Sequence, residues 1–320
     1  MKQIVIVGSI AYDEIETPHG RSGKILGGAA TYSSFAAAYF DVQVKIISVV
    51  GGDFKPEYIE LFKKRNIDIT GLEIKKDEKT FYWHGKYLEN MNKRQSLITD
   101  LNVLEKFDPI VPESYKEPDI LLLANLSPIV QLSVIKQLKR RPRLIVLDTM
   151  DFWIMTKLEE LMAVFKNIDV LTINDQEAFL LSGQNTLRAA ASKILEMGPK
   201  YVIIKKGEHG ALLFTKEKIF FAPALPLYQV FDPTGAGDTF AGGLCGYLAT
   251  TNDYSFENLK NGVITGSVLA SFTVEDFGTN KLQNIKTDEI INRIGEFIEL
   301  VKFNFPKTDK IFNKNYKNEN

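Results

Sequence analysis

Short apolar runs rich in β-branched residues and leucine recur along the chain, and most end at a polar residue or a glycine. Runs of this length and composition predict strands that are buried on both faces, as in a parallel sheet. From about residue 119 onward, segments with helical periodicity separate the runs, which predicts successive βαβ units. The predicted strands of this set are residues 4–7, 44–50, 120–124, 144–147, 170–173 and 201–204.

Two regions depart from this pattern. Residues 14–25 are polar and turn-rich, and residues 68–102 contain short runs in which aromatic and polar side chains alternate. Such alternation is typical of a sheet with one face in water. We therefore expect strands outside the main sheet here, with a solvated hairpin insertion as the simpler alternative.

Composition narrows the class of protein. With 320 residues, 45% hydrophobic residues and a net charge of −1, the chain suits one large α/β domain or two smaller ones and indicates no nucleic-acid or anionic-membrane partner. The single cysteine, Cys245, excludes an internal disulfide and a cysteine-based zinc cluster, and it is expected to pack as a small hydrophobe. No signal peptide or membrane-length apolar run is evident, so we expect a cytoplasmic protein.

The strongest chemical signal is the stretch FDPTGAGDTFAGGLCGYL. Gly235, Ala236 and Gly237 run into a predicted helix, where unpaired backbone N–H groups and the helix dipole form an anion site. Asp238 then lies at the mouth of that site. A carboxylate repels a bound anion, but it suits a general base that takes a proton from a hydroxyl attacking phosphorus. The alternative is a glycine-rich loop capped by an aspartate, with no ligand.

Four motifs together resemble the phosphofructokinase-B (PfkB), or ribokinase-like, family of carbohydrate and nucleoside kinases. They are DPTGAGDTFAGG, LGGAATYSSFAAA, NDQE and KKGEHG. The resemblance covers nearly the whole chain. It implies a three-layer α/β/α domain over residues 1–305 with a mostly parallel central sheet and a small β-sheet lid from about 14–25 and 68–102. A polar tail, 306–320, would follow.

Asp13 is the first candidate for binding the acceptor substrate. It follows a predicted strand, and ligands of open parallel sheets bind outside the carboxyl ends of the strands. A loop-capping carboxylate is the alternative, whereas a dinucleotide site is disfavoured because GSIAYD lacks the glycines of GxGxxG. The resemblance implies that Asp13, Gly27 and Gly28 hold the acceptor, and Asn125, at the carboxyl end of another predicted strand, is a further candidate.

Two residues depart from the ribokinase pattern. Ala11 and Tyr32 stand where ribokinases or many family members carry asparagine. The aromatic ring of Tyr32 either stacks on a sugar face or nucleobase, or belongs to the core. These departures weaken a ribose assignment and suit a nucleoside such as adenosine or a cyclitol.

The expected lid offers two further alternatives. Its aromatic residues Phe81, Trp83 and Tyr87 belong either to the active site or to a homodimer interface, because family members often dimerise through the lid. The lid has no obvious basic cluster, which disfavours a phosphorylated acceptor, although Lys93 and Arg94 keep that possibility open.

The candidate nucleotide site starts at NDQE. Asn174 and Glu177 are three residues apart, so both can face one point at the start of a helix. The resemblance implies that they position Mg²⁺ and phosphates through water, and a simple N-cap is the alternative. Either Lys205 or Lys206 would contact the ATP phosphates, but neighbouring strand residues alternate faces and the pattern does not choose between them.

The resemblance assigns the rest of this site as well. It implies that Gly207, Gly210 and Thr234 contact the nucleotide, that the loop near Gly278 helps to form an adenine slot, and that Asp232 with carbonyls near Gly278 holds a monovalent cation such as K⁺.

The sequence therefore predicts an ATP- and Mg²⁺-dependent kinase that phosphorylates an alcohol group of a sugar or nucleoside, with Asp238 as base. A kinase specific for adenosine or another nucleoside is one alternative. A non-catalytic nucleoside or sugar sensor on the same fold is the other, and it is disfavoured because a pure binding protein needs no base beside an anion site.

Overall fold

The computed structural model of the protein describes residues 1–91 and 93–304, and within them nine strands form the central sheet. The strand order is β13-β12-β11-β10-β9-β8-β1-β4-β5. Neighbours from β11 to β5 pair in parallel, and β12 and β13 are antiparallel. The strands are β1 (Lys2–Val7), β4 (Val42–Gly51), β5 (Ile67–Lys75), β8 (Ile120–Leu123), β9 (Leu144–Asp148), β10 (Val170–Asn174), β11 (Tyr201–Lys205), β12 (Ala211–Phe214) and β13 (Ile219–Ala222).

Burial on both faces explains the uninterrupted apolar runs. In β1, Ile4 and Ile6 belong to one core cluster, whereas Val5 and Val7 belong to another. Successive side chains of a strand point to opposite faces, so each apolar run contributes to both cores. The predicted three-layer arrangement with a mostly parallel sheet is confirmed.

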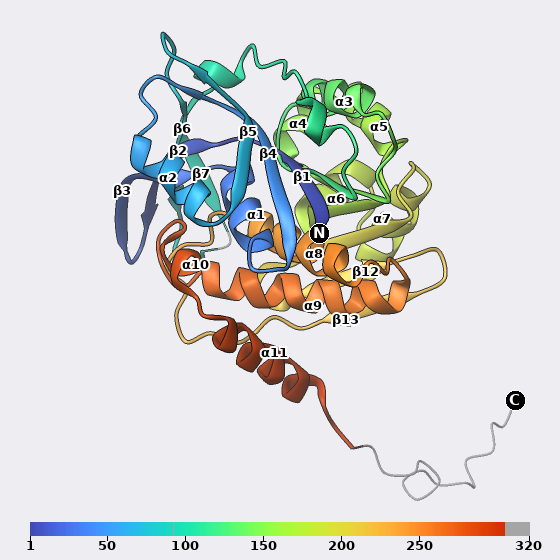
Figure 1. Cartoon of the computed structure of the whole chain (residues 1–320). Helices are drawn as coiled ribbons and strands as arrows, with labels where there is room; N and C mark the ends of the chain where they lie inside the picture. The colour runs from blue at the N-terminus through green and yellow to red at the C-terminus, as the bar shows by residue number, and fades with distance from the viewer. Residues whose placement is uncertain (92, 305–320) are drawn as a thin grey trace, which may run out of the picture.

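Helices cover each face of the sheet (Figure 1). The helices on one face are α1 (Ala29–Ala37), α2 (Pro56–Lys64), α8 (Ala236–Thr251), α9 (Phe256–Thr273), α10 (Asn280–Asn284) and α11 (Thr287–Val301). The helices on the other face are α3 (Pro128–Gln137), α4 (Asp151–Thr156), α5 (Leu158–Phe165), α6 (Asp175–Ser182) and α7 (Leu187–Leu195). Short 3₁₀ turns are η1 (Asn102–Leu104), η2 (Glu113–Tyr115) and η3 (Gly207–His209).

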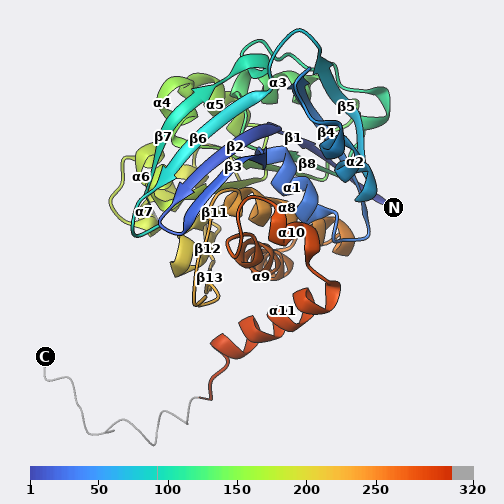
Figure 2. The same ribbon diagram turned by 90° about the vertical axis from the view of Figure 1, so that its left-hand side faces the viewer.

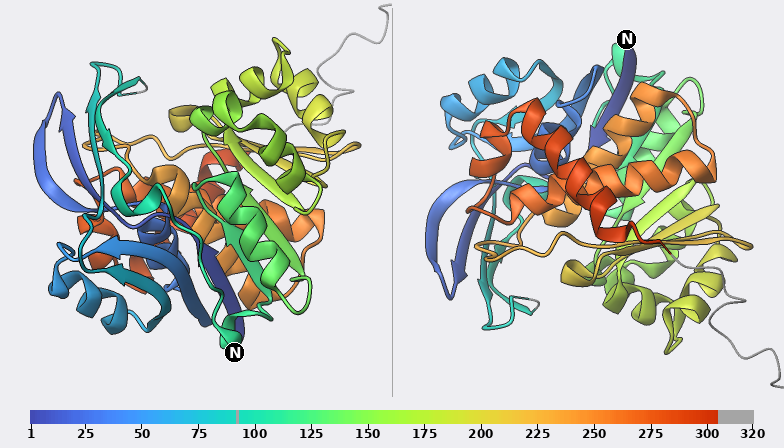
Figure 3. Two further views of the ribbon diagram at one scale, coloured as in Figure 1. Left: turned by 90° about the horizontal axis from the view of Figure 1, so that it is seen from above. Right: turned by 90° about the horizontal axis from the view of Figure 1, so that it is seen from below.

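A second, four-stranded sheet of order β3-β2-β6-β7 forms the expected lid. Its strands are β2 (Ala11–Thr17), β3 (Gly20–Gly27), β6 (Phe81–Tyr87) and β7 (Arg94–Asp100). Two antiparallel hairpins, β2–β3 and β6–β7, are joined by a parallel ladder between β2 and β6. Figure 2 shows the four strands side by side, and Figure 3 shows the hairpins, drawn in blue and teal, projecting from the body.

One part of the predicted lid belongs elsewhere. Residues 68–75 form most of β5, which pairs in parallel with β4 at the edge of the main sheet. Its polar positions and the half-exposed Ile74 (53% exposed) reflect an edge strand with one partner, so the alternating pattern had two possible causes.

The remaining features of the fold concern α4 and α5, the single cysteine, the absence of a membrane-spanning helix among the described residues, and the C-terminal tail. The short helices α4 and α5 follow each other directly and are separated at Lys157, whose backbone is not helical (φ −141°, ψ 40°). Cys245 is buried in α8, as expected. Among the described helices, none combines the length and apolar character needed to cross a membrane. The predicted tail 306–320 lies outside the described residues.

Candidate active site

The glycine-rich loop turns into α8 at Gly235. Gly235 caps the helix in the left-handed region (φ 75°), and a Cβ there would lie 2.4 Å from ring atoms of Tyr32. Both the backbone conformation and the close approach of the ring require glycine at this position. The first turn of α8 therefore begins sharply at Gly235, and the Ala236 N–H donates to the Pro233 carbonyl (3.2 Å). Anion binding by the N–H groups of this turn stays a prediction.

Asp238 lies in that first turn. Its Oδ1 atom is buried and has no hydrogen-bond partner among the described residues. Burial raises the pKa of Asp238 to about 7; the nearby Asp148 carboxylate adds to the rise, and the Lys205 ammonium opposes it. The Asp238 backbone carbonyl accepts a 2.9 Å hydrogen bond from Ser33 Oγ, which ties this turn to α1. The structure thus holds, beside the helix end, a buried carboxyl group with one unpaired oxygen and a pKa of about 7.

Lys205, at the end of β11, reaches the same loop. Its Nζ donates a 2.7 Å hydrogen bond to Asp148 Oδ1, and a Cβ on Gly237 would lie 3.0 Å from this nitrogen. Burial disfavours the charge of Lys205, but the carboxylates of Asp148 and Glu177 outweigh it and raise its pKa. Of the two candidate lysines, Lys205 therefore faces the glycine-rich loop at the start of α8. Residues 233–238 of this loop are called the anion loop below.

The KKGEHG segment forms the turn between β11 and β12. The Lys206 backbone N–H donates to the Gly210 carbonyl (2.8 Å), and the Gly210 N–H donates to the Gly207 carbonyl (3.1 Å). These bonds close the turn beside Lys205. Contact of Lys206, Gly207 and Gly210 with a nucleotide stays a prediction.

Asn174 and Glu177 form a capping box at the start of α6. The Glu177 N–H donates to Asn174 Oδ1 (2.7 Å), and the Asn174 N–H donates to Glu177 Oε2 (2.8 Å). The N-cap alternative is therefore present in the structure. Burial raises the pKa of Glu177 to about 7, and the charge of Lys205 opposes the rise, so the two side chains lie close enough for their charges to interact. The capping box and a role near phosphates are compatible.

Asp13 approaches the site from the lid strand β2. It is buried, and a Cβ on Gly27 would lie 1.9 Å from Asp13 Oδ2, so the carboxylate lies directly against that glycine. Burial raises the pKa of Asp13 to about 7, and Asp232 and Asp238 add to the rise, whereas a hydrogen bond from the Gly28 backbone opposes it. Asp13 and Asp238 are thus close enough to affect each other's ionisation.

Tyr32 belongs to the core. It is 1% exposed, its ring packs against Gly235, and its hydroxyl is buried with no hydrogen-bond partner among the described residues. A ring without an exposed face cannot stack on a sugar or base. Of the two alternatives for Tyr32, the structure thus favours the core over substrate binding.

Asn125 follows β8, and its side-chain amide is already engaged. It donates to Met150 Sδ (3.1 Å) and accepts a bond from Trp153 Nε1 (2.9 Å). These contacts orient the amide toward the start of α4. Its role in binding the acceptor stays a prediction.

Asp232 joins the anion loop to the loop at Gly278. Its two oxygens accept bonds from the backbone N–H groups of Thr234 (2.8 Å) and Gly278 (2.9 Å). The Asp232 carboxylate is completely buried, and these two bonds give its oxygens the partners that a buried group needs. The binding of a monovalent cation by Asp232 stays a prediction.

The sequence-based site omitted Asp148 and gave no firm place to Tyr87 or Arg94. Asp148 was recognisable only as a polar residue at a strand end. Tyr87 is 6% exposed and accepts a 3.1 Å hydrogen bond from Thr234 Oγ1, so it faces the site and not a dimer interface. Arg94 is exposed, but its charge lies near enough to oppose the rise in the pKa values of Tyr87 and Asp238 that their burial causes. The homodimer through the lid stays a prediction.

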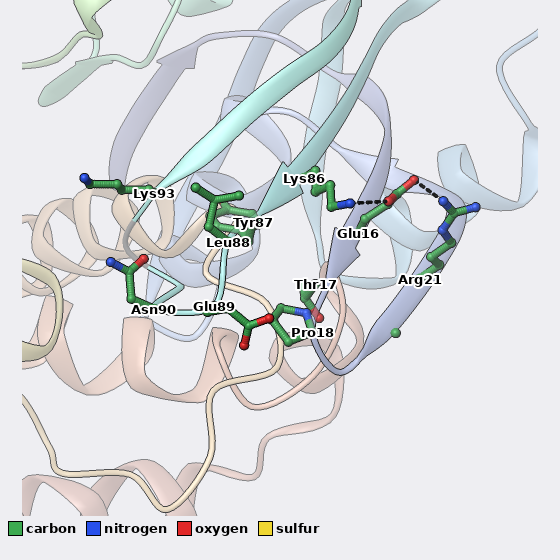
Figure 4. A pocket seen from close by; sticks show the side chains of 11 residues that line it. Glu16, Thr17, Pro18, Arg21, Lys86, Tyr87, Leu88, Glu89, Asn90 and Lys93 are labelled. Carbon is green, nitrogen blue, oxygen red and sulfur yellow. Dashed lines mark ion pairs between the residues drawn. The ribbon is translucent and has the colours of Figure 1, made fainter.

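A cavity of about 710 Å³ lies at the tips of the two lid hairpins (Figure 4). Glu16, which lines it, pairs with Arg21 (2.6 Å) and Lys86 (3.9 Å). Because these charges satisfy one another and Asp238 does not line the cavity, we place the candidate site at the loop before α8. Within the described residues, no group of three or more His, Cys, Asp or Glu side chains is arranged to hold a metal ion.

The geometry around α8 agrees with what sequence comparison finds. Residues 1–286 match the pfkB family of carbohydrate kinases. The chain belongs to that family. This pfkB-family kinase is 29% identical over 252 residues to a cytidine kinase of Thermococcus kodakarensis, which covers 77% of this chain and 89% of the relative.

Two further comparisons agree. A nucleoside kinase of Methanocaldococcus jannaschii is 28% identical over 312 residues, covering 92% of this chain and 97% of the relative. The crystal structure of the Methanocaldococcus jannaschii nucleoside kinase, described as an archaeal member of the ribokinase family, superposes with a TM-score of 0.76 at 23% identity, covering 92% of this chain and 99% of that structure. The ribokinase-like fold and the kinase class predicted from the sequence are confirmed.

Proposed function

We propose that this pfkB-family kinase transfers the γ-phosphoryl group of ATP to a hydroxyl of a nucleoside, with Asp238 as the general base. The observation that carries the proposal is the unpaired Oδ1 of Asp238, which lies at the N-terminal end of α8 in a carboxyl group that ionises near pH 7. A base is most effective when its pKa lies near the working pH. The relatives named as cytidine and nucleoside kinases support a nucleoside as acceptor.

The other residues then have complementary tasks. Asp13 accepts hydrogen bonds from hydroxyls of the acceptor and orients the one that reacts. Asp238 removes the proton of that hydroxyl as the oxygen attacks the γ-phosphorus. The N–H groups at Gly235 and Gly237 donate to the phosphoryl oxygens, and that of Ala236 joins them by leaving the Pro233 carbonyl, to which it donates here (3.2 Å). The Lys205 ammonium neutralises part of the phosphoryl charge.

The residues present fit the Mg²⁺ that the family resemblance implies. Glu177 is a buried carboxyl whose ionisation is disfavoured, and a nearby cation would offset that cost. Mg²⁺ keeps most of its water, so Glu177 and Asn174 would hold it through water molecules. When bound, the ion supplies charge neutralisation at the phosphates.

The acceptor is tested by measuring ADP release with Mg-ATP against a panel of cytidine, adenosine, inosine, ribose, fructose, fructose 6-phosphate and inositol, each with and without K⁺. We expect a nucleoside to give the highest kcat/KM. A sugar that exceeds every nucleoside would contradict the nucleoside assignment. ATP binding with no turnover on any acceptor would favour the sensor alternative.

The pH dependence follows from the raised pKa of Asp238. Only the ionised carboxylate accepts a proton, so kcat/KM for the acceptor should fall by about tenfold for each pH unit below 7 and level off above it. A steeper fall would indicate that Glu177 or Asp13, whose pKa values are also about 7, must be ionised as well. Initial rates in overlapping buffers from pH 5 to 9 measure this, and a flat profile between pH 5 and 7 would contradict the assignment of the base.

A further inference from the structure

The lid and the anion loop are joined by one buried hydrogen bond. Thr234 Oγ1 donates to the Tyr87 hydroxyl at 3.1 Å, between residues 147 positions apart in the chain. Tyr87 is 6% exposed and Thr234 is 8% exposed. Hydroxyl groups buried to this degree need partners, so separating the two would leave both unsatisfied unless water entered.

Both ends of this bond are held by their own surroundings. On the loop, the Thr234 N–H donates to Asp232 Oδ1 at 2.8 Å, and Gly235 follows directly as the cap of α8. On the lid, Tyr87 is the last residue of β6, burial raises its pKa, and the nearby charge of Arg94 opposes the rise. A displacement of β6 is therefore transmitted to the backbone that directs the loop N–H groups.

The same face of the lid carries the acceptor-binding candidate. Asp13 of β2 lies opposite Trp83 of β6 in the parallel ladder, so the two residues share a face. Trp83, Gly85 and Tyr87 alternate along β6, and a Cβ on Gly85 would lie 2.1 Å from the Trp83 ring, which places that ring over the same face. An acceptor held by Asp13 thus lies under the strand that carries Tyr87.

We propose that Tyr87 is a positioning residue, which aligns the anion loop through Thr234 when the lid lies over a bound acceptor. The inference rests on the proposed kinase function. Tyr87 itself touches neither ATP nor the reacting oxygen in this scheme. Its hydroxyl couples occupation of the acceptor site to the geometry of Gly235, Ala236 and Gly237, so that phosphoryl transfer is favoured only when an acceptor is in place.

A double-mutant cycle tests the coupling. Tyr87→Phe and Thr234→Val each remove one hydroxyl, and each should lower kcat by roughly 3–10-fold with little change in the KM for ATP. Because both changes break the same bond, the double variant should be no slower than the slower single variant. Thr234→Ser keeps the hydroxyl and should restore most of kcat. Losses that multiply in the double variant, or full kcat in Tyr87→Phe, would overturn the proposal.

Tyr82→Phe is the matched control. Tyr82 also lies on β6, and its hydroxyl donates a 2.8 Å bond to Glu14 within the lid. Removing that hydroxyl perturbs the lid to a similar extent without touching the anion loop, so kcat should stay within about twofold of the wild-type value. An equal loss of kcat in Tyr82→Phe would mean that Tyr87 acts only by stabilising the lid.

A measurement without turnover separates this inference from the proposed function. Amide hydrogen exchange of residues 234–239 should be faster in Tyr87→Phe than in the wild type or in Tyr82→Phe, with no substrate present. Faster exchange in a protein that phosphorylates no tested acceptor would support the coupling and leave the nucleoside assignment contradicted. Unchanged exchange would overturn the coupling even in an active kinase.

Discussion

Replacing Asp238 by asparagine is expected to lower kcat by roughly 10²–10⁴-fold, the range for loss of a general base, while ATP binding is retained. Asparagine has nearly the same shape but cannot accept the proton of the acceptor hydroxyl. The substitution also removes a negative charge close to where the ATP phosphates would bind. Because that charge repels phosphate, the affinity for ATP should not fall. Steady-state kcat and calorimetric titration with Mg-ATP measure the two quantities.

Asp41→Asn provides the control for that variant. Asp41 is exposed and directly precedes β4. The first residue of β4 pairs with Lys2, the first residue of β1, so Asp41 lies at the N-terminal ends of the parallel strands, away from the site. The same chemical change there should leave kcat unaltered. Near-normal turnover of Asp238→Asn would remove Asp238 from the role of base.

Gly27→Ala is expected to lower kcat/KM for the acceptor by roughly 10–100-fold, the loss that corresponds to about 1.5–3 kcal/mol for hydrogen bonds to a charged group. The added Cβ would lie 1.9 Å from Asp13 Oδ2, so the carboxylate must move away from its present position. The KM for ATP should change little, because Gly27 lies on the lid side of the site. Initial rates with each substrate varied in turn measure the difference.

The Asp13→Ala background supplies the control for this second variant. If Gly27→Ala acts by displacing the Asp13 carboxylate, adding it to Asp13→Ala should cause no further loss of kcat/KM. A further loss of similar size in the Asp13→Ala background would show that Gly27→Ala acts by another route, such as distortion of β3.

The parts of the fold that depend on local burial could be predicted from the sequence. The run Ile4 to Val7 has no polar position because both faces of β1 are covered, and this is why the parallel sheet was recognisable. The position of Asn174 at a strand end followed directly, because parallel strands bring their carboxyl ends to one edge. Asp13 was expected on a loop after the first strand, but it lies inside the lid strand β2. The start of α8 just before Asp238 followed from the glycines of its loop.

The features that depend on partners distant in the chain could not be predicted. β5 alternates like a lid strand, and only its pairing with β4 places it in the main sheet. The choice of Lys205 over Lys206 required the bond to Asp148, and the burial of Tyr32 required its contact with Gly235. In each case the sequence pattern allowed two environments, and a tertiary contact selected one.

The position of Tyr87, with its hydroxyl against the anion loop, also depends on a partner distant in the chain. The register of β6 against β7 shifts at Leu97 of β7, so β6 itself alternates regularly, but alternation alone does not say which of its two faces covers the site. Its partner Thr234 lies 147 residues away, and no local pattern connects the two. This contact could be recognised only in the folded structure.

The lid also constrains the order in which the chain folds. Its two hairpins meet only through the β2–β6 ladder, and the chain between them builds α1, β4, α2 and β5 of the main body. Closing that long loop costs less entropy once these elements have already condensed, so we expect the complete lid sheet to assemble after the N-terminal half of the core. If the lid is needed for turnover, activity on refolding should return later than the secondary structure of the main sheet.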